Sequence, residues 1–174
     1  RFAFRSGLVM KPVFAKAKTQ PVRVIYAEGE EERVLRATQV VLEEKLARPI
    51  LVGRPSVVEA RLARFGLSIK AGQDFDLVNP EDDPRYRSYV QTYIDVAGRR
   101  GVTPEAARTV VRTNNTVIAA LAVVRGEADA MICGVEGRYM SHLRHVREIV
   151  GFLPGVRDFA ALSMMITSKG TYFI

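Results

Sequence analysis

The chain has 174 residues, 48% of them hydrophobic and 26% charged, which is enough to bury one globular core without disulfide or metal staples. The single cysteine, Cys133, excludes an internal disulfide framework, and the lack of a long apolar run predicts a cytoplasmic protein with no membrane partner. Of the net charge of +7, residues 1–23 contribute +6, because they carry six basic and no acidic residues, whereas the remaining chain carries 20 basic and 19 acidic residues, a balance of +1. A nucleic-acid-binding face would place its positive charge on the folded body, so we expect no nucleic acid partner.

The first hundred residues alternate between short apolar runs and segments with helical spacing. Residues 1–20 form a basic leader that we expect to reach the domain as a short helix or linker. The acids Glu30, Glu31 and Glu32 are expected in the first turn of a helix, where they complement its dipole. Runs rich in Val and Ile predict strands, and apolar residues three and four apart predict helices. On these patterns we expect strands at 22–27, 49–53 and 74–78, and helices at 30–46, 56–65 and 85–99.

The second half of the chain carries clearer helix boundaries. Thr103 followed by Pro104 is a strong N-terminal signal, and Asn115 is a second cap candidate, for a helix that ends before Gly126. Further on we expect a strand at 129–134, a helix at 139–150 and a strand region at 156–167. Buried strands that alternate with helices are typical of parallel βαβ units, so the predicted fold class is α/β.

Both ends of the sequence are unusual for natural termini. The chain begins with Arg1 and ends in the apolar run Thr171–Ile174, which is typical of a strand rather than of a polar tail. We therefore expect a piece of a longer protein. A docked C-terminal strand is the alternative interpretation.

A dinucleotide site is not expected after the first strand. The fingerprint of such sites needs three glycines that let a pyrophosphate approach the N-terminus of a helix. This chain has Gly29 followed by three glutamates, which repel phosphate and already satisfy the helix dipole.

Three other patterns favour structural roles. Tyr86, Tyr89 and Tyr93 form one stripe of a helix, which predicts a core or a subunit interface. Asp82 and Asp83 adjoin a turn and a helix start, which favours capping over a pair of catalytic carboxylates. The lone cysteine has no activating neighbour in sequence, which favours a small buried hydrophobe.

The segment from residue 134 to residue 147 is the candidate ligand site. Gly134 opens a strand-to-helix turn, where open α/β sheets bind their ligands. Arg138, Arg144 and Arg147 would supply positive charge to a phosphate-like group, and a solvated helix face is the alternative.

His142 and His145 lie three residues apart and share a predicted helix face with Arg138. A metal site would need further carboxylate or imidazole ligands, and the neighbouring arginines oppose a cation. We therefore expect no metal here and interpret both histidines as surface or interface residues.

The chain also contains five stretches of distinctive sequence: Tyr26–Arg36, Arg48–Gly53, Asn79–Tyr86, Arg100–Thr103 and Asp129–Gly134. Together they resemble the first half of the phosphate acetyl/butyryl transferase family. The leader Phe4–Phe14 is similar to the junction in large bacterial NADP-dependent malic enzymes, where a malic-enzyme half precedes a phosphotransacetylase-like half.

The resemblance implies a three-layer α/β/α fold with a mainly parallel sheet of the isocitrate-dehydrogenase-like type, here truncated. Residues 1–20 would be the junction from an upstream catalytic half, residues 21–150 the first phosphotransacetylase-like domain, and residues 151–174 the start of a second domain. The resemblance also implies a homo-oligomer.

The candidate turn departs from the pattern of active family members, which carry a Ser/Thr-rich stretch ending in Arg-Pro after the glycine that matches Gly134. Arg144 matches the family arginine, but His145 replaces the proline, and Tyr139 and Met140 stand where Thr-Ala is usual. Hydroxyl donors to phosphate are largely lost, and the Glu that follows two residues after the glycine is unfavourable beside an anion.

Two further departures concern the family's arginines. One expected before Gly101 falls on Ala97, although Arg99 and Arg100 are close. The family's C-terminal catalytic acid and arginine segment would lie beyond Ile174. The resemblance therefore implies that this segment has no catalytic residue of its own.

The expected function is that of a non-catalytic regulatory and oligomerisation domain of an NADP-dependent malic enzyme, with acetyl-CoA as effector. Gly134, Arg138, Arg144 and Arg147 are the expected contacts to acyl-CoA or phosphate. NADP and a divalent metal, Mg or Mn, would bind the upstream malic-enzyme domain in cis. The alternatives are an active phosphate acetyltransferase and a purely structural role.

Overall fold

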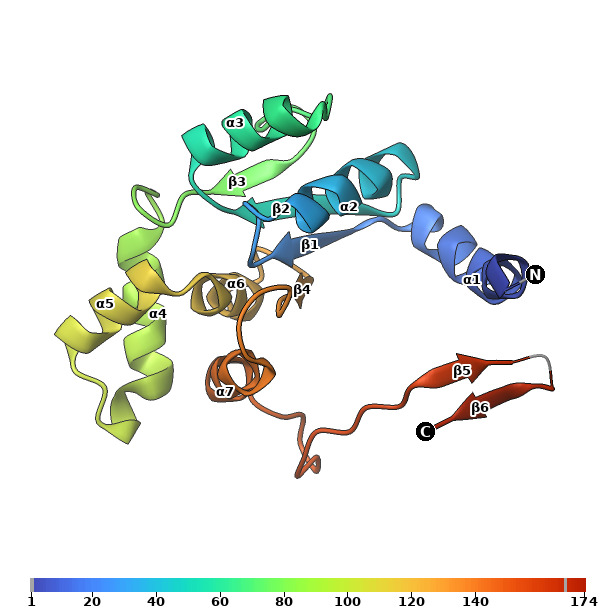
Figure 1. The fold of residues 1–174 in the computed structure, drawn as a ribbon. Helices are drawn as coiled ribbons and strands as arrows, with labels where there is room; N and C mark the ends of the chain where they lie inside the picture. Colours follow the sequence, from blue (N-terminus) through green and yellow to red (C-terminus); the bar gives the residue numbers. More distant parts are fainter. Residues whose placement is uncertain (1, 168) are drawn as a thin grey trace.

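A computed structural model of the chain describes residues 2–167 and 169–174 (Figure 1). The helices are α1 (Phe2–Thr19), α2 (Glu32–Glu43), α3 (Pro55–Phe65), α4 (Tyr86–Ala97), the short 3₁₀ turn η1 (Gly98–Arg100), α5 (Pro104–Thr113), α6 (Asn115–Val124) and α7 (Tyr139–Ile149). The strands are β1 (Val22–Tyr26), β2 (Ala47–Val52), β3 (Asp76–Val78), β4 (Ala130–Ile132), β5 (Met164–Ile166) and β6 (Thr171–Phe173). None of the helices in these residues has the length and apolar character that crossing a membrane requires.

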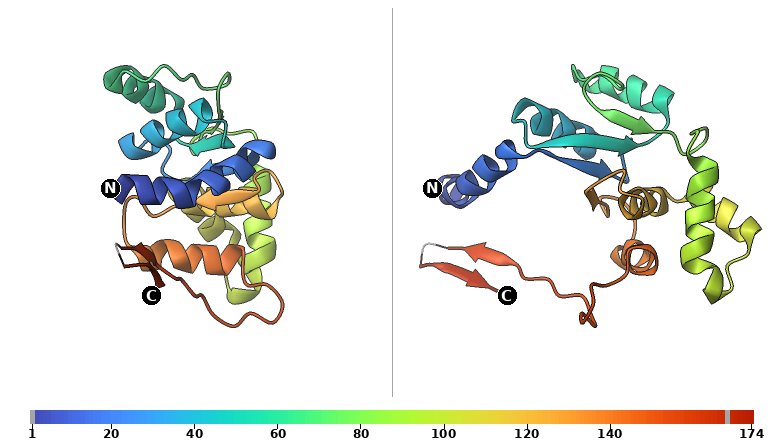
Figure 2. Two further views of the ribbon diagram at one scale, coloured as in Figure 1. Left: turned by 90° about the vertical axis from the view of Figure 1, so that its right-hand side faces the viewer. Right: turned by 180° about the vertical axis from the view of Figure 1, so that it is seen from behind.

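Four parallel strands form the main sheet, in the spatial order β3-β2-β1-β4. Helices α2 and α3 cover one face, and α6 with its neighbours α4, α5 and α7 lies on the other (Figures 1 and 2). This arrangement confirms the predicted α/β class with a mainly parallel sheet between helical layers.

Side chains of the central strands alternate between two cores. Ile25 and Ile50 belong to the core formed with α4–α7, whereas Tyr26 and Leu51 belong to the core formed with α2 and α3. Because helices cover both faces, these strands have to be apolar at successive positions, which explains their continuous Val- and Ile-rich sequence. Helix α6 is likewise buried over seven successive residues, Thr116–Ala122.

The structure corrects three local expectations. The side chain that caps α6 is Asn114, not Asn115, because its Oδ1 accepts the N–H of Val117. Of the strand region expected at 156–167, only residues 164–166 form a strand. Only the last of the three glutamates lies in the first turn of α2, since the preceding one is its N-cap and the first lies outside the helix.

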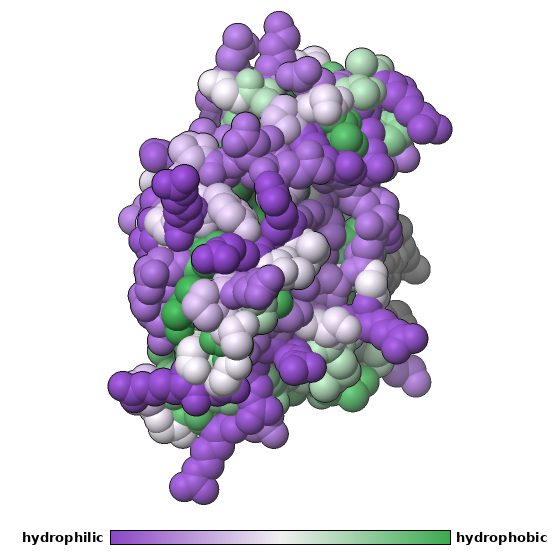
Figure 3. Space-filling view, turned by 90° about the vertical axis from the view of Figure 1, so that its left-hand side faces the viewer, coloured by the Kyte–Doolittle hydropathy of each residue, from purple (hydrophilic) through white to green (hydrophobic). Residues whose placement is uncertain are grey.

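The C-terminal residues lie away from the main sheet. Residues 151–163 leave α7 as an irregular extended segment, and the antiparallel β5–β6 hairpin follows it next to α1 (Figures 1 and 2). Large apolar side chains are exposed along this stretch: Leu153, Leu162, Tyr172, Phe173 and Ile174. By contrast, the face over α4 and α5 is mainly hydrophilic, with only small apolar patches (Figure 3).

Gly29 allows the turn after β1 to pack directly on β2. A Cβ at this position would lie 2.7 Å from the Cβ of Leu51 and 2.7 Å from the carbonyl oxygen of Val52. The Gly29 N–H donates to the same carbonyl at 3.0 Å, so the two backbones are held together. The glycine is therefore required for close approach and not for a phosphate.

We expect Gly29→Ala to lower the free energy of unfolding by about 1–3 kcal/mol, the usual cost of forcing extra volume into a packed interior. Gly98→Ala is the matched control, because a Cβ there would meet only the Ile94 side chain at 3.7 Å. Denaturant unfolding of the intact protein measures both. Equal stability of the two variants would contradict the close-approach argument.

Arg23 and Asp129 join the starts of β1 and β4. Arg23 donates from Nε at 3.1 Å and from Nη2 at 2.7 Å to the Asp129 carboxylate, which also accepts the Arg23 N–H at 2.8 Å. These hydrogen bonds favour the ionised carboxylate and lower the pKa of Asp129 to about 2.

A lowered pKa in the folded state stabilises the protein above the unfolded pKa of about 4, and this stabilisation is lost as the pH falls toward 2. We therefore expect Asp129→Asn to be less sensitive to acid than the wild type when unfolding is measured between about pH 5 and pH 3. Asp82→Asn, at an exposed position, should retain the wild-type acid sensitivity. An unchanged pH slope in Asp129→Asn would count against the pairing.

Candidate functional site

The sheet has a topological switch point between β1 and β4. The chain leaves β1 for β2 on one side, and β4 lies on the other, so the carboxyl ends of β1 and β4 open the crevice where α/β folds bind ligands. Glu28 follows β1 and Gly134 follows β4. The Gly134 N–H donates to Oε1 of Glu28 at 2.8 Å. The Glu28 carboxylate therefore accepts the N–H of Gly134, the residue that the sequence analysis named as an expected contact to acyl-CoA or phosphate.

His142 lies next to this contact and binds the turn that leads from β4 into α7. Its Nε2 lies 2.6 Å from the carbonyl oxygen of Glu136, which can only accept, so Nε2 carries the hydrogen. Its Nδ1 then accepts from the Thr116 hydroxyl at 2.8 Å, and lies 3.7 Å from Oε1 of Glu28. One imidazole thus joins the turn after β4, the start of α6 and the turn after β1.

His145, one turn further along α7, contacts the other side of the α6 start. Its Nε2 lies 3.0 Å from Nδ2 of Asn114, whose Oδ1 is already used as the α6 cap. Its Nδ1 is buried without a hydrogen bond and lies 3.9 Å from Oε2 of Glu148. Burial lowers the pKa of His145, because the charged imidazolium loses its hydration.

The side chains of His142 and His145 are 17% and 22% exposed, so the surface alternative is wrong, whereas the interface alternative stays a prediction. Within the part of the chain that the structure describes, no three His, Cys, Asp or Glu side chains are grouped so that they could hold a metal ion. The histidines serve instead to connect α7 to α6.

Arginines converge at a different place, a cavity between η1 and α7. Its volume is about 730 Å³, and Arg144 and Arg147 line it together with Arg100. Val102, Glu148, Gly151 and Phe152 complete the lining. The guanidinium of Arg147 lies 5.6 Å from the centre of the Phe152 ring, which holds it by a cation–π contact.

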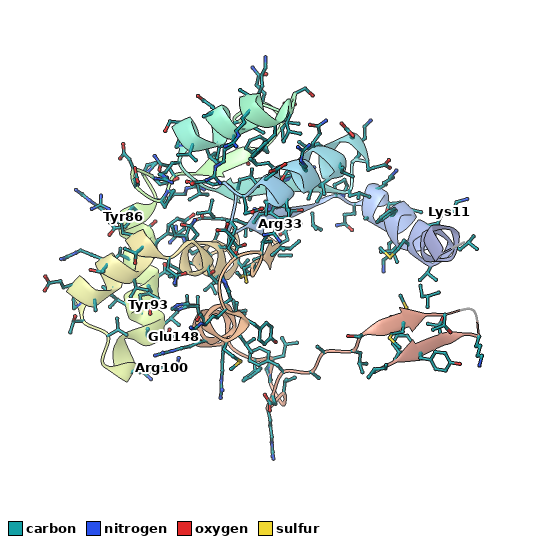
Figure 4. The ribbon with its side chains drawn as sticks, viewed as in Figure 1. Lys11, Arg33, Tyr86, Tyr93, Arg100 and Glu148 are labelled. Atoms are coloured by element: carbon teal, nitrogen blue, oxygen red, sulfur yellow. The ribbon has the colours of Figure 1, made fainter. Side chains whose placement is uncertain are left out.

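Glu148 is the negative group in this arginine cavity. Tyr93 donates to its Oε2 at 3.4 Å, and Arg100 lies 3.5 Å from its carbonyl oxygen. Figure 4 shows Tyr93, Arg100 and Glu148 gathered between α4 and α7. Three arginines and one glutamate line the cavity, which leaves an excess of positive charge that suits an anionic ligand.

The structure divides the predicted site residues into two groups. Arg144 and Arg147 both line the arginine cavity, whereas Gly134 and Arg138, which the sequence analysis grouped with them, are not among its lining residues. Arg138 is an exposed residue before the first turn of α7. Arg100, which the sequence analysis noted only as a neighbour of Ala97, provides the third guanidinium.

The tyrosine and cysteine patterns keep the structural role expected of them. The expected aspartate cap is wrong, because the N-cap of α4 is Arg85 without a side-chain cap, and Asp83 instead accepts the Arg85 N–H through its Oδ1. Tyr89 and Tyr93 are buried in the core, and Tyr86 packs against it. Cys133 is half-buried against the same core, and burial, together with the nearby Glu28, raises the pKa of its thiol. A raised pKa keeps the thiol protonated and unreactive at neutral pH.

Comparison with known proteins places this geometry in a family. Residues 8–174 match the protein family described as phosphate acetyl/butaryl transferase. Two solved phosphotransacetylases, from Staphylococcus aureus and Streptococcus pyogenes, superpose with TM-scores of 0.82 and 0.83. Each superposition covers 94% of this chain at 23% and 22% identity, and 49% and 50% of the solved chain, respectively.

The sequence is more similar to malic enzymes than to these two phosphotransacetylases. It is 64% identical over 174 residues to an NAD-dependent malic enzyme of Rhizobium meliloti, and 47% identical over 173 residues to an NADP-dependent malic enzyme of Escherichia coli. Each match covers 99% of this chain but only 23% of the relative. A phosphate acetyltransferase of Nitratidesulfovibrio vulgaris is 29% identical over 150 residues. Because the family match covers residues 8–174 of the chain, the chain belongs to the phosphate acetyl/butaryl transferase family.

Proposed function

We propose that the chain is a non-catalytic regulatory and oligomerisation domain of a malic enzyme, and that acetyl-CoA is its effector. The observation that carries the proposal is the combination of whole-chain identity to malic enzymes with a span of only 23% of their length. Oxidative decarboxylation of malate would then take place in an upstream part of the same polypeptide. The nicotinamide cofactor, NADP or NAD, and a divalent metal, Mg or Mn, would bind there.

The switch point supports a role without acyl transfer. A transferase of this family has to hold phosphate and stabilise the charge that develops on the transferred group. Here the Gly134 N–H is taken by Glu28, and Glu136 adds a second carboxylate to the same turn. Tyr139 and Met140, where the family carries Thr-Ala, are exposed side chains at the start of α7.

The arginine cavity is the best place for the effector. Its volume of about 730 Å³ falls in the range of sites for small organic ligands, roughly 300–1,000 Å³. Coenzyme A thioesters carry several phosphate charges and an apolar adenine ring. Three arginines would pair with the phosphates, and Phe152 and Val102 offer an apolar surface to the ring.

Regulation by this route requires two states of the protein that bind acetyl-CoA with different affinity. An effector bound beside α7 would shift a subunit arrangement if α7 adopts different positions in the two states. We therefore assign the oligomer, and not a single chain, as the unit that responds.

We expect Arg144→Ala combined with Arg147→Ala to raise the acetyl-CoA concentration needed for half inhibition of malate turnover by at least about tenfold, because each lost charge-assisted bond weakens binding by about 1.5–3 kcal/mol. Turnover without acetyl-CoA should stay within about twofold of the wild type, because the site of decarboxylation is elsewhere in the intact enzyme.

Arg157→Ala is the control, since it removes an exposed arginine of the extended segment after α7. Light scattering confirms that the assembly size is unchanged. Full acetyl-CoA inhibition in the double variant would refute the effector site. Full inhibition after deletion of the whole region would refute the regulatory role itself.

An active phosphate acetyltransferase is the second candidate, and one observation favours it: phosphate acetyltransferases are among the relatives, at 29% and 27% identity. The deciding assay is formation of acetyl phosphate from acetyl-CoA and phosphate by the intact protein. We expect no turnover above background. Robust turnover would establish this candidate in place of the regulatory domain.

A further inference from the structure

His145 stands where the family resemblance leads one to expect a proline, and the structure gives this substitution a defined environment. A proline has no titratable group, whereas His145 places one next to the wall of the arginine cavity. Its Nδ1 lies 3.9 Å from Oε2 of Glu148, which lines that cavity. The ring itself is 78% buried, so a charge on it would be poorly screened by water.

The hydrogen bonds define the neutral tautomer of His145. Nδ2 of Asn114 can only donate, so Nε2 of His145 accepts and the ring hydrogen lies on Nδ1, facing Glu148. Protonation would add a second hydrogen at Nε2, opposite the Asn114 amide. The bond between these two side chains would then be lost, so the unliganded protein favours the neutral ring.

The charged groups around His145 come from each element packed against it. On its own helix these are Glu148, Arg144 and His142, of which only Glu148 favours protonation. From α4, Tyr93 donates to the Glu148 carboxylate, and from η1, Arg100 donates to the Glu148 backbone carbonyl. The neutral ring thus lies among charged side chains of which one, Glu148, is negative and several are positive.

We propose that the arginine cavity binds its anionic ligand together with a proton, which His145 takes up at Nε2. This inference rests on the proposed function only in that it uses the same cavity. The proton comes from solvent and no covalent bond changes. The protonated ring then pairs through Nδ1 with Glu148.

The physical reason is the carboxylate inside the cavity. Glu148 repels any anion that approaches the three arginines, and in the neutral-ring state this repulsion is uncompensated by its histidine neighbour. An imidazolium beside Glu148 cancels that charge and adds attraction to the ligand. By linkage, a ligand that favours the protonated ring binds more tightly as the pH falls, and the ring holds its proton more tightly when the ligand is bound.

The test uses two anions on the intact protein. Sulfate keeps both charges between about pH 6 and pH 8, so its affinity reports on the protein alone, whereas acetyl-CoA reports on the proposed effector. Calorimetry should show the sulfate Kd falling about tenfold from pH 8 to pH 6, with proton uptake that appears as different heats in two buffers.

Three variants separate His145 from the general rise in positive charge at low pH. His145→Gln should bind sulfate with less than a twofold change over this range. Glu148→Gln should bind it tightly at both pH values, because the opposing carboxylate is gone. His142→Gln removes the imidazole that faces Glu28 and Thr116, and its sulfate Kd should still fall from pH 8 to pH 6, because His145 and Glu148 are both retained.

The outcomes distinguish this inference from the proposed function. If both anions bind with an affinity that does not depend on pH, or if His145→Gln keeps the wild-type pH dependence, proton-linked binding is overturned while the effector role stays in place. If sulfate binding depends on pH but acetyl-CoA does not bind at all, proton-linked binding is supported and the effector role is overturned. Failure of both anions to bind at any pH would overturn both.

Discussion

The hydrogen bond from the Gly134 N–H to the Glu28 carboxylate determines how the rest of this domain is used. It joins the carboxyl ends of β1 and β4, which is the place where a parallel sheet of this topology offers its backbone to a ligand. With that donor satisfied from within, the crevice becomes a structural joint, and His142 extends it to the start of α6. The arginines that line a cavity lie elsewhere, between α7 and η1.

The α7 helix therefore has two functional faces. Its two histidines point toward α6 and are buried, whereas Arg144 and Arg147 line the cavity next to η1. Glu148 belongs to both environments, because its carboxylate contacts Tyr93 and lies within ion-pairing distance of His145. A helix arranged in this way connects the cavity to the packing of the core.

The sequence predicted the fold well, because the fold rests on local signals. Continuous Val and Ile runs predicted the buried strands, and Thr103-Pro104 predicted the start of α5, where the Thr103 hydroxyl accepts the N–H of Ala106. The strand expected over residues 156–167 failed for a non-local reason: a β-prone run becomes a strand only where another strand pairs with it, and only residues 164–166 find one.

The site was less predictable because its contacts are distant in sequence. The partners of the two histidines, Thr116 and Asn114, lie 26 and 31 residues earlier, so spacing alone gave no sign that the rings are buried. The choice between Asn114 and Asn115 as cap depended on which amide reaches Val117. Arg100 was already noted in the sequence beside Ala97, where the family resemblance leads one to expect an arginine. Arg138 could not have been excluded from the cavity without knowing the course of the turn.

The β5–β6 hairpin carries a consequence for how this region behaves in isolation. An isolated two-stranded hairpin is only marginally stable in water, and an uncovered strand edge is a template for pairing with other chains. With Phe173 and Ile174 each about two-thirds exposed, the hairpin is the part of the domain most prone to self-association. The order of these last residues is therefore a property of their surroundings more than of their own sequence.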